Sequence, residues 1–167
     1  DYMGPSVKNI KAISEIFLKE NIYNLVYLTM TPDMLKEIKD AFGNNVTIIT
    51  YADFYNKKIQ ENVEKYSENI FNAIYTSNNI KLLKNFFYYY DVPLYDIIKE
   101  RLEYFFIKRM KEILTIISCL NTCFENIKPA MIIESQDKYY LGVISTQLAE
   151  SYNIPSASTQ AGINADV

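Results

Sequence analysis

The chain has no histidine and no tryptophan among its 167 residues, and it has only two cysteines. Without histidine, the commonest general base and the commonest metal ligand are both missing, so any chemistry must use carboxylates, hydroxyls, tyrosines or backbone groups. Cys119 and Cys123 lie four residues apart in a predicted helix, and a zinc site there would need further cysteine or histidine ligands. The sequence therefore predicts two buried free thiols, no metal site and no bound cofactor.

Long apolar runs and an excess of positive charge are also lacking. No stretch approaches the ~20 apolar residues of a membrane-spanning helix, and no basic-apolar leader opens the chain, so we expect a cytoplasmic protein. Seventeen Lys and Arg against twenty Asp and Glu give a net charge of -3, which disfavours binding to nucleic acid. The chain is 49% hydrophobic, with fifteen Tyr and nine Phe, which is enough apolar material for a folded domain with a core.

The C-terminal part of the chain has the order of a β-α-β unit. Proline cannot continue a helix, so Lys128-Pro129 ends the helix that precedes it. A short apolar run then meets four polar residues, Glu134–Asp137, which is the pattern of a buried parallel strand followed by its polar carboxyl end. A helix with apolar residues three and four apart follows and ends at Asn153–Pro155. The next few residues have room for one more short strand.

Upstream, two strands alternate with helices. Thr31-Pro32-Asp33 starts a helix with a hydroxyl cap, a proline at the first helical position and an acid in the first turn, and Gly43 ends it. Residues that suit a pleated sheet flank this helix on both sides. The alternation predicts an α/β fold with a mostly parallel sheet flanked by helices. Its expected strands are Leu25–Thr29, Val46–Thr50, Ala130–Glu134 and Ser156–Thr159.

Before the third of these strands lies a long segment, Asp53–Ile127, in which apolar residues recur at three and four but almost never at two. We predict that it is a wholly helical insertion. Its last helix, from Leu94 to about Phe124, would be roughly 45 Å long at 1.5 Å per residue, so it should kink or project. Apolar stripes of that size usually mark contact surfaces, so we expect a homodimer with Phe105 and Phe106 near its centre.

Two features of the insertion have alternative interpretations. The aromatic run Phe86–Tyr90 forms helix core, which we favour, or it lines a groove for a sugar or a lipid. The long helix carries four cations that a membrane surface would attract, but Glu and Lys are mixed along it, which favours a solvated face. Those cations are Arg101, Lys108, Arg109 and Lys111.

Ligands of open parallel sheets bind outside the carboxyl ends of the strands. Four segments follow such strand ends, or the place where a strand end is expected, so the sequence predicts that they line one cleft. These segments are Gly4–Ser6, Thr29–Thr31, Glu134–Asp137 and Gln160–Gly162. Of the two acids in these segments, Asp137 is either a functional acid or the cap of its helix, whereas nothing local requires Glu134. The segment before the first helix also offers backbone N–H groups to a ligand. The predicted substrate-binding residues are Gly4, Pro5, Ser6, Thr29, Thr31, Ser135, Gln136, Gln160 and Gly162.

Two of these segments resemble a known family. Pro129–Asp137, followed by a helix and then by Asn153–Ile163, resembles the end of the N-terminal domain of GT-B glycosyltransferases. Capsule, surface-polysaccharide and CDP-glycerol-type transferases share the pattern, as do the related UDP-N-acetylglucosamine 2-epimerases. Three positions depart from it. Ala130 replaces the Asp after the proline, Ala161 stands where transferases often carry His, and Gln160 stands where epimerases carry Glu.

The resemblance implies a single Rossmann-like domain over residues 1–167, on the acceptor side of a two-domain transferase of surface-polysaccharide synthesis. It also implies that a C-terminal domain lies outside this sequence and that the chain alone is inactive. The first strand of such a domain either lies outside this sequence as well or is reduced to Asp1–Met3. The nucleotide-activated donor would be held mainly by the C-terminal domain, since no Gly-x-Gly-x-x-Gly or Gly-Lys-Ser motif is present here. With no His, Glu134 or Asp137 would accept the proton of a sugar or polyol acceptor hydroxyl. Such a protein could sit peripherally at the inner face of the membrane.

Two other functions stay open at this point. One is the N-terminal half of a UDP-sugar 2-epimerase, in which Asp137 would match the strand-tip acid of that family, although Gln160 argues against it. The other is a non-enzymatic α/β module whose long helix docks a partner.

Overall fold

The computed structural model describes residues 5–20, 26–29, 32–134 and 140–158. The chain divides into two compact units. Unit 1 combines Asp1–Phe54 with Cys119–Val167, and unit 2 is Tyr55–Ser118. Unit 2 falls inside the segment that the sequence predicts as an insertion. No helix within the described ranges is both long and apolar enough to cross a membrane.

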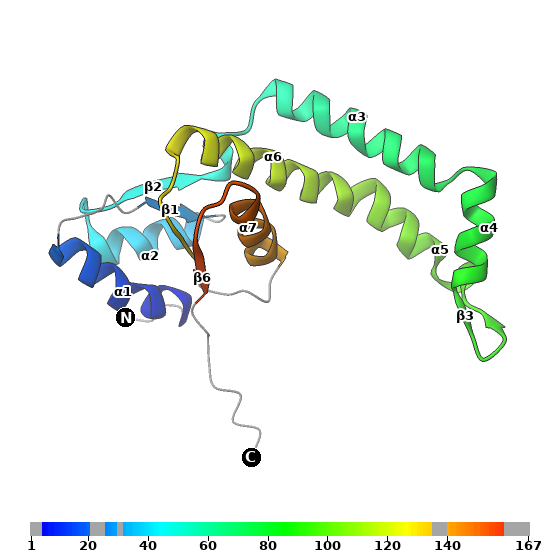
Figure 1. Cartoon of the computed structure of the whole chain (residues 1–167), viewed down its shortest axis with the longest axis horizontal. Helices are drawn as coiled ribbons and strands as arrows, with labels where there is room; N and C mark the ends of the chain where they lie inside the picture. The colour runs from blue at the N-terminus through cyan, green and yellow to red at the C-terminus, as the bar shows by residue number, and fades with distance from the viewer. Residues whose placement is uncertain (1–4, 21–25, 30–31, 135–139, 159–167) are drawn as a thin grey trace, which may run out of the picture. The chain divides into compact units, whose positions relative to one another are not determined.

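Unit 1 has the alternating helices and strands of an α/β fold (Figure 1). The residue pattern places its elements correctly, with ends that shift by one to three residues. Gly43 ends the second helix at a φ of 60°, a conformation in which a side chain would be strained. The elements are α1 (Pro5–Glu20), β1 (Val26–Thr29), α2 (Pro32–Phe42), β2 (Thr47–Thr50), η1 (Tyr51–Asp53), the end of α6 (Met110–Ile127), β5 (Ile132–Glu134), α7 (Tyr140–Ser151) and β6 (Ser156–Ser158).

The strands of unit 1 pair in parallel, as predicted. β1 pairs with β2 from Val26↔Thr47 to Thr29↔Thr50, and β5 pairs with β6 from Ile132↔Ser156 to Glu134↔Ser158. Among the described residues these are two separate two-stranded sheets. The mixed α/β class is therefore confirmed, and the described strands of unit 1 form two parallel pairs.

Core residues of unit 1 come mainly from helices. Ser14 of α1 and Tyr27 of β1 share a hydrogen bond of 2.5 Å, and the Tyr27 ring lies 5.1 Å from that of Phe42. The prediction that the third strand is buried on both faces is wrong. β5 is only half-buried and β6 is exposed throughout. Parallel strands are buried on both faces only where helices cover both, and among the described residues α7 is the one helix that packs closely against these two strands. The buried apolar residues of this unit are Ile38, Phe42, Cys119, Leu120, Cys123, Phe124 and Ala149.

Unit 2 is mostly helical. Asn56 caps its first helix by accepting a hydrogen bond of 3.0 Å from the backbone N–H of Ile59. Ile59 and Val63 are buried on this helix, and Tyr75 at its end lies edge-on to the Phe106 ring at 6.5 Å. The predicted long helix is continuous but contains a π-helical turn. The elements are α3 (Lys57–Ile74), α4 (Ser77–Phe86), β3 (Tyr88–Tyr89), β4 (Val92–Pro93), α5 (Tyr95–Tyr104), the π-helical turn η2 (Phe105–Arg109) and the start of α6.

A β-hairpin interrupts the segment that was predicted to be wholly helical, so that prediction is wrong. Tyr88 pairs with Pro93 and Tyr89 with Val92 in an antiparallel ladder. The two loop residues, Tyr90 and Asp91, have φ values of 47° and 63°, the positive angles that a type I′ hairpin turn requires at both positions. Neighbouring tyrosines favour strand conformation, and Pro93 cannot sit within a helix, so the local preferences for a hairpin prevail over the helical spacing. The aromatic run is therefore not helix core.

Candidate functional site

Most of the predicted cleft lies outside the described residues. Glu134 is the one predicted site residue whose side-chain contacts are described, at the end of β5. Pro5 and Ser6 are the first residues of α1, and Thr29 is the last residue of β1. The remaining predicted residues are outside the described ranges: Gly4, Thr31, Ser135, Gln136, Asp137, Gln160 and Gly162.

The β5-α7-β6 unit brings the ends of two strands together. Glu134 of β5 stands opposite Ser158 of β6, and both are the last residues of their strands. Because the strands are parallel, the chain leaves both at the same edge of the sheet. The predicted segment Glu134–Asp137 begins at that edge, and Gln160–Gly162 begins two residues after Ser158 in the sequence. The geometry therefore brings together the described residues that lead into two of the four predicted segments.

Glu134 is held by a hydroxyl from α7. The Ser145 hydroxyl donates a hydrogen bond to Oε1 of Glu134, and it also lies 3.1 Å from the backbone oxygen of Gly142. Ser145 is buried, with 4% of its surface exposed, and Glu134 is half-buried. Sequence reasoning missed Ser145. The available signal was its position four residues after Leu141 and three before Leu148, on the apolar stripe of the predicted helix.

Burial sets the proton affinity of this carboxyl group. Removal from water raises the pKa of Glu134 above its ordinary value, and the hydrogen bond from Ser145 partly opposes that rise. A carboxyl group with a raised pKa exchanges its proton closer to neutral pH, which suits a general acid or base. Glu134 therefore has the position and the environment of a candidate catalytic acid or base.

A second carboxylate lies just beyond the end of β2. Oδ2 of Asp53 accepts hydrogen bonds from the backbone N–H of Thr50 at 2.6 Å and from the Thr50 hydroxyl at 3.1 Å. These contacts close the short η1 turn. Asp53 therefore has a structural role that accounts for its position, and Glu134 remains the stronger candidate.

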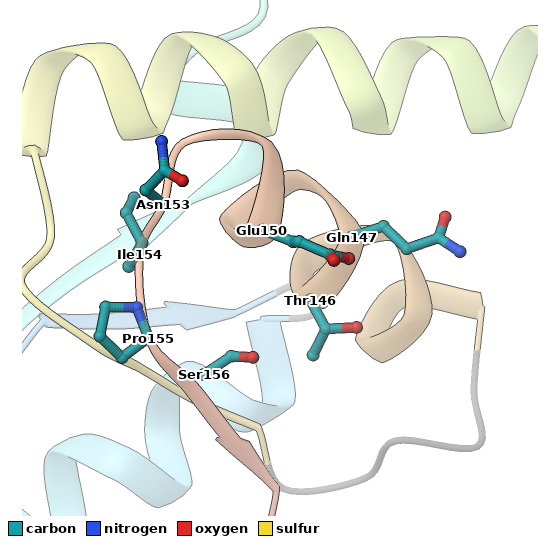
Figure 2. Close-up of a pocket in the computed structure, with 7 residues that line it drawn as sticks. All are labelled: Thr146, Gln147, Glu150, Asn153, Ile154, Pro155 and Ser156. Carbon is teal, nitrogen blue, oxygen red and sulfur yellow. The ribbon is translucent and has the colours of Figure 1, made fainter.

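A shallow pocket of about 500 Å³ lies between α7 and the segment that leads into β6 (Figure 2). Asn153, at a φ of 55°, ends α7 in the left-handed conformation. The Asn153 N–H donates to the Glu150 oxygen at 3.0 Å, and the Ile154 N–H donates to the Ala149 oxygen at 2.9 Å, as in a Schellman motif. The pocket is at the amino end of β6, whereas Glu134 is at the carboxyl end of β5, so it is not part of the predicted cleft. Its lining residues are Thr146, Gln147, Glu150, Asn153, Ile154, Pro155 and Ser156.

Neither a metal site nor a reactive cysteine is found in the part of the chain that the structure describes. Within those residues, no three His, Cys, Asp or Glu side chains gather closely enough to hold a metal ion. Cys119 and Cys123 are free and buried, which confirms the prediction for the thiols. Burial raises the pKa of Cys123 from its ordinary value of 9.0 to about 11, so this thiol is a poor nucleophile at neutral pH.

Comparison of the chain with protein-family models, with characterised proteins and with solved structures gave no match.

Proposed function

We propose that this chain is the acceptor-side domain of a GT-B-like transferase that modifies a sugar or polyol in surface-polymer synthesis. The observation that carries the proposal is the half-buried carboxyl group of Glu134 at the carboxyl end of β5, next to the parallel end of β6. Ligands of parallel α/β sheets bind at such edges. In this proposal the two parallel pairs belong to one Rossmann-like sheet, and the protein acts in the cytoplasm.

Glu134 is the proposed general base of the transfer. Its carboxylate accepts the proton of the acceptor hydroxyl while the hydroxyl oxygen forms a bond to the donor's anomeric carbon, or to phosphorus in a CDP-polyol. The bond from that atom to the nucleotide leaving group breaks in the same step, and Glu134 later returns its proton to solvent. Asp137 is the alternative base. A separate C-terminal domain would hold the nucleotide-activated donor.

Two other functions predict different ligands. A UDP-sugar 2-epimerase half would bind the nucleotide-sugar itself. A non-enzymatic interaction module would bind neither sugars nor nucleotides. One observation favours the module: Ile97, Tyr104 and Ile107 of the long helix expose 70%, 49% and 50% of their surface, and neither transferase nor epimerase chemistry requires that.

An NMR titration of the ¹⁵N-labelled chain distinguishes these functions. We would add glycerol phosphate, short oligosaccharides, UDP-N-acetylglucosamine and CDP-glycerol separately. Acceptor-side function predicts that the polyol or oligosaccharide shifts the amide signals of Glu134 and of residues 142–146, and that Glu134→Gln weakens binding. Stronger shifts with UDP-N-acetylglucosamine would favour the epimerase half. Absence of shifts with every ligand would overturn both enzymatic proposals.

A matched control separates the candidate base from the shallow pocket. Glu150 is an exposed carboxylate on α7 in that pocket. Glu150→Gln removes one carboxylate charge from the same β5-α7-β6 unit without touching the β5 edge. Acceptor binding should therefore be retained in Glu150→Gln. If both variants weaken binding equally, the pocket is the binding site and the role of Glu134 fails.

A further inference from the structure

The hairpin of unit 2 carries a group of exposed apolar side chains that no proposed chemistry uses. We call it the aromatic tip, and it comprises the end of α4 and the β3–β4 hairpin. Figure 1 shows the hairpin extending beyond the end of α4. The exposed fractions in this group run from 50% to 84%. The aromatic tip consists of Phe86, Tyr88, Tyr89, Tyr90 and Val92.

Both faces of the hairpin are exposed. Successive residues of a strand point to opposite faces, so Tyr88 with its partner Pro93 lies on one face and Tyr89 with its partner Val92 lies on the other. Tyr88 is 55% and Tyr89 is 64% exposed. A hairpin with one face packed on a core would have one buried ring and one exposed ring, whereas here the two exposed fractions are similar. Water therefore contacts tyrosine rings on both faces.

The apex of the turn holds a side chain that its backbone conformation disfavours. Tyr90 has a φ of 47°, where glycine or asparagine is the usual residue of a type I′ turn. It is also the most exposed large residue of the tip, at 84%. Its ring contacts that of Tyr89 edge-on at 4.6 Å. A bulky ring at a position suited to asparagine points to a use for the ring outside the hairpin.

The size and shape of the tip favour a lipid bilayer over a folded protein as its binding partner. A stable protein partner covers about 800 Å² on each side. One hairpin face offers one tyrosine and one smaller residue, on the order of 200–300 Å², and exposed Phe86 at the end of α4 adds about 150–250 Å², which together stay below that area. A second copy or another protein would leave the opposite face in water. A lipid bilayer closes around an inserted tip and covers both faces at once.

The polar groups of the tip fit the headgroup region of a bilayer. Tyrosine combines an apolar ring with a hydroxyl, and membrane interfaces are enriched in it. Lys81 and Lys84 of α4 are offset by Asp91 in the turn and Asp96 in α5, so the local charge is balanced. This balance favours burial of rings over attraction to anionic lipid.

We propose that the aromatic tip inserts into the interfacial region of a lipid bilayer, with Tyr90 as the deepest residue. The tip attaches the chain peripherally, without a membrane-spanning segment. This inference uses unit 2 alone and does not depend on the role of Glu134.

The lack of tryptophan in this chain permits a direct test. Tyr90→Trp places a single tryptophan at the apex, and Tyr66→Trp places one at a 59% exposed position of α3 as the matched control. Both proteins would be mixed with phosphatidylcholine vesicles, with and without phosphatidylglycerol. We expect a blue shift of the emission, and quenching by lipids brominated near the headgroup, for the tryptophan at position 90 only. Unchanged emission at position 90 with both vesicle types, or equal shifts at positions 90 and 66, would overturn the proposal.

Tyr90→Asn keeps the test independent of folding. Asparagine suits the positive φ of this position, so the variant should fold at least as well as the original chain, as circular dichroism and thermal unfolding would establish. Co-sedimentation with phosphatidylcholine vesicles should nevertheless weaken about tenfold. Lys81→Gln with Lys84→Gln should change binding by less than about twofold, because burial of the rings carries the interaction. Unaltered binding by Tyr90→Asn, binding that requires phosphatidylglycerol, or a Tyr90-dependent dimer without vesicle binding would each contradict insertion.

Discussion

Ser145 of α7 donates a hydrogen bond to the Glu134 carboxyl group at the end of β5. The same hydroxyl lies 3.1 Å from the Gly142 oxygen, so it has a second acceptor when Glu134 is protonated. Glu134 can then donate its proton toward Ser145 while Ser145 donates to Gly142. One buried hydroxyl thus has a hydrogen-bond arrangement for both protonation states of the carboxyl group.

Ser145→Ala should raise the pKa of Glu134 further. The hydrogen bond favours the ionised carboxylate and opposes the effect of burial, so without it the protonated form gains. A ¹³C NMR titration of the Glu134 carboxyl carbon measures this directly. We also expect a loss of about 1–3 kcal/mol of unfolding free energy near neutral pH, since a charged hydrogen bond is removed.

Ser151→Ala is the control for this substitution. The Ser151 hydroxyl also donates to a backbone oxygen of α7, that of Leu148 at 2.7 Å, but Ser151 is exposed at the end of the helix. It should leave the titration of Glu134 unchanged. If Ser145→Ala leaves that titration unchanged as well, the hydroxyl does not control the proton affinity of Glu134.

Glu134→Gln should remove a pH dependence of stability. Burial raises the folded-state pKa of Glu134 above its ordinary value of 4.5. Its contribution to stability is therefore highest below the ordinary value, and it is lost as pH rises through the raised folded-state pKa. Urea unfolding should find Glu134→Gln more stable than the original chain at about pH 8, with a smaller difference at about pH 4. The glutamine oxygen can still accept a hydrogen bond from Ser145.

Glu150→Gln gives the baseline for this comparison. Exposed surface substitutions usually change unfolding free energy by less than about 0.5 kcal/mol. The difference in unfolding free energy between Glu134→Gln and Glu150→Gln should therefore grow as pH rises. A difference that stays constant across the pH range would mean that burial does not affect Glu134 in this way.

The two cysteines should resist alkylation until the protein opens. Cys123 is buried with a pKa of about 11, against an ordinary value of 9.0, which lowers its thiolate fraction at about pH 8 roughly a hundredfold. Iodoacetamide labelling followed by mass spectrometry should be slow in buffer and fast in urea at the same pH. Rapid labelling of both thiols in the folded protein would contradict their burial.

Patterns with a clear period predicted most of unit 1 from sequence. Thr31-Pro32-Asp33 and Gly43 carry start and stop signals that depend only on local chemistry, and α2 lies between them. Parallel pairing of β5 with β6 followed from the strand-helix-strand order. Glu134 was singled out because no local cap or turn explains an acid there. Its partner Ser145 was not, because a place on the apolar stripe indicates burial but does not identify Glu134 as the partner until the packing of α7 on β5 is known.

The hairpin was missed because these residues carry a helical spacing and lack the usual residues of a turn. The spacing of Leu83, Phe86 and Phe87 continues a helix, while Tyr90-Asp91 lacks the glycine or asparagine that usually marks a type I′ turn. Burial was overestimated for a related reason. Periodicity identifies which residues share a face, but the exposure of Tyr88 and Tyr89 depends on whether another element covers them. Sequence spacing does not contain that information.

The final prediction concerns self-association through the long helix, for which the sequence places Phe105 and Phe106 at the centre. The structure separates their roles. Phe105 is 41% exposed, whereas Phe106 is half-buried and its ring lies edge-on to that of Tyr75 at 6.5 Å. Tyr104 and Ile107 of the same part of the helix are also exposed, at 49% and 50%.

Phe105→Lys should therefore leave a folded monomer, because it removes an exposed ring and adds a solvated charge to the contact surface. Phe106→Lys should instead destabilise the fold by about 1–3 kcal/mol, since it removes packing against Tyr75. Tyr66→Lys, at an exposed site on α3, is the control for adding a charge to unit 2. Light scattering at about 100 μM, with thermal unfolding of each variant, measures both effects. If the original chain is a monomer at that concentration, or if Phe105→Lys associates as strongly as the original, the helix surface around Phe105 is not a contact between copies.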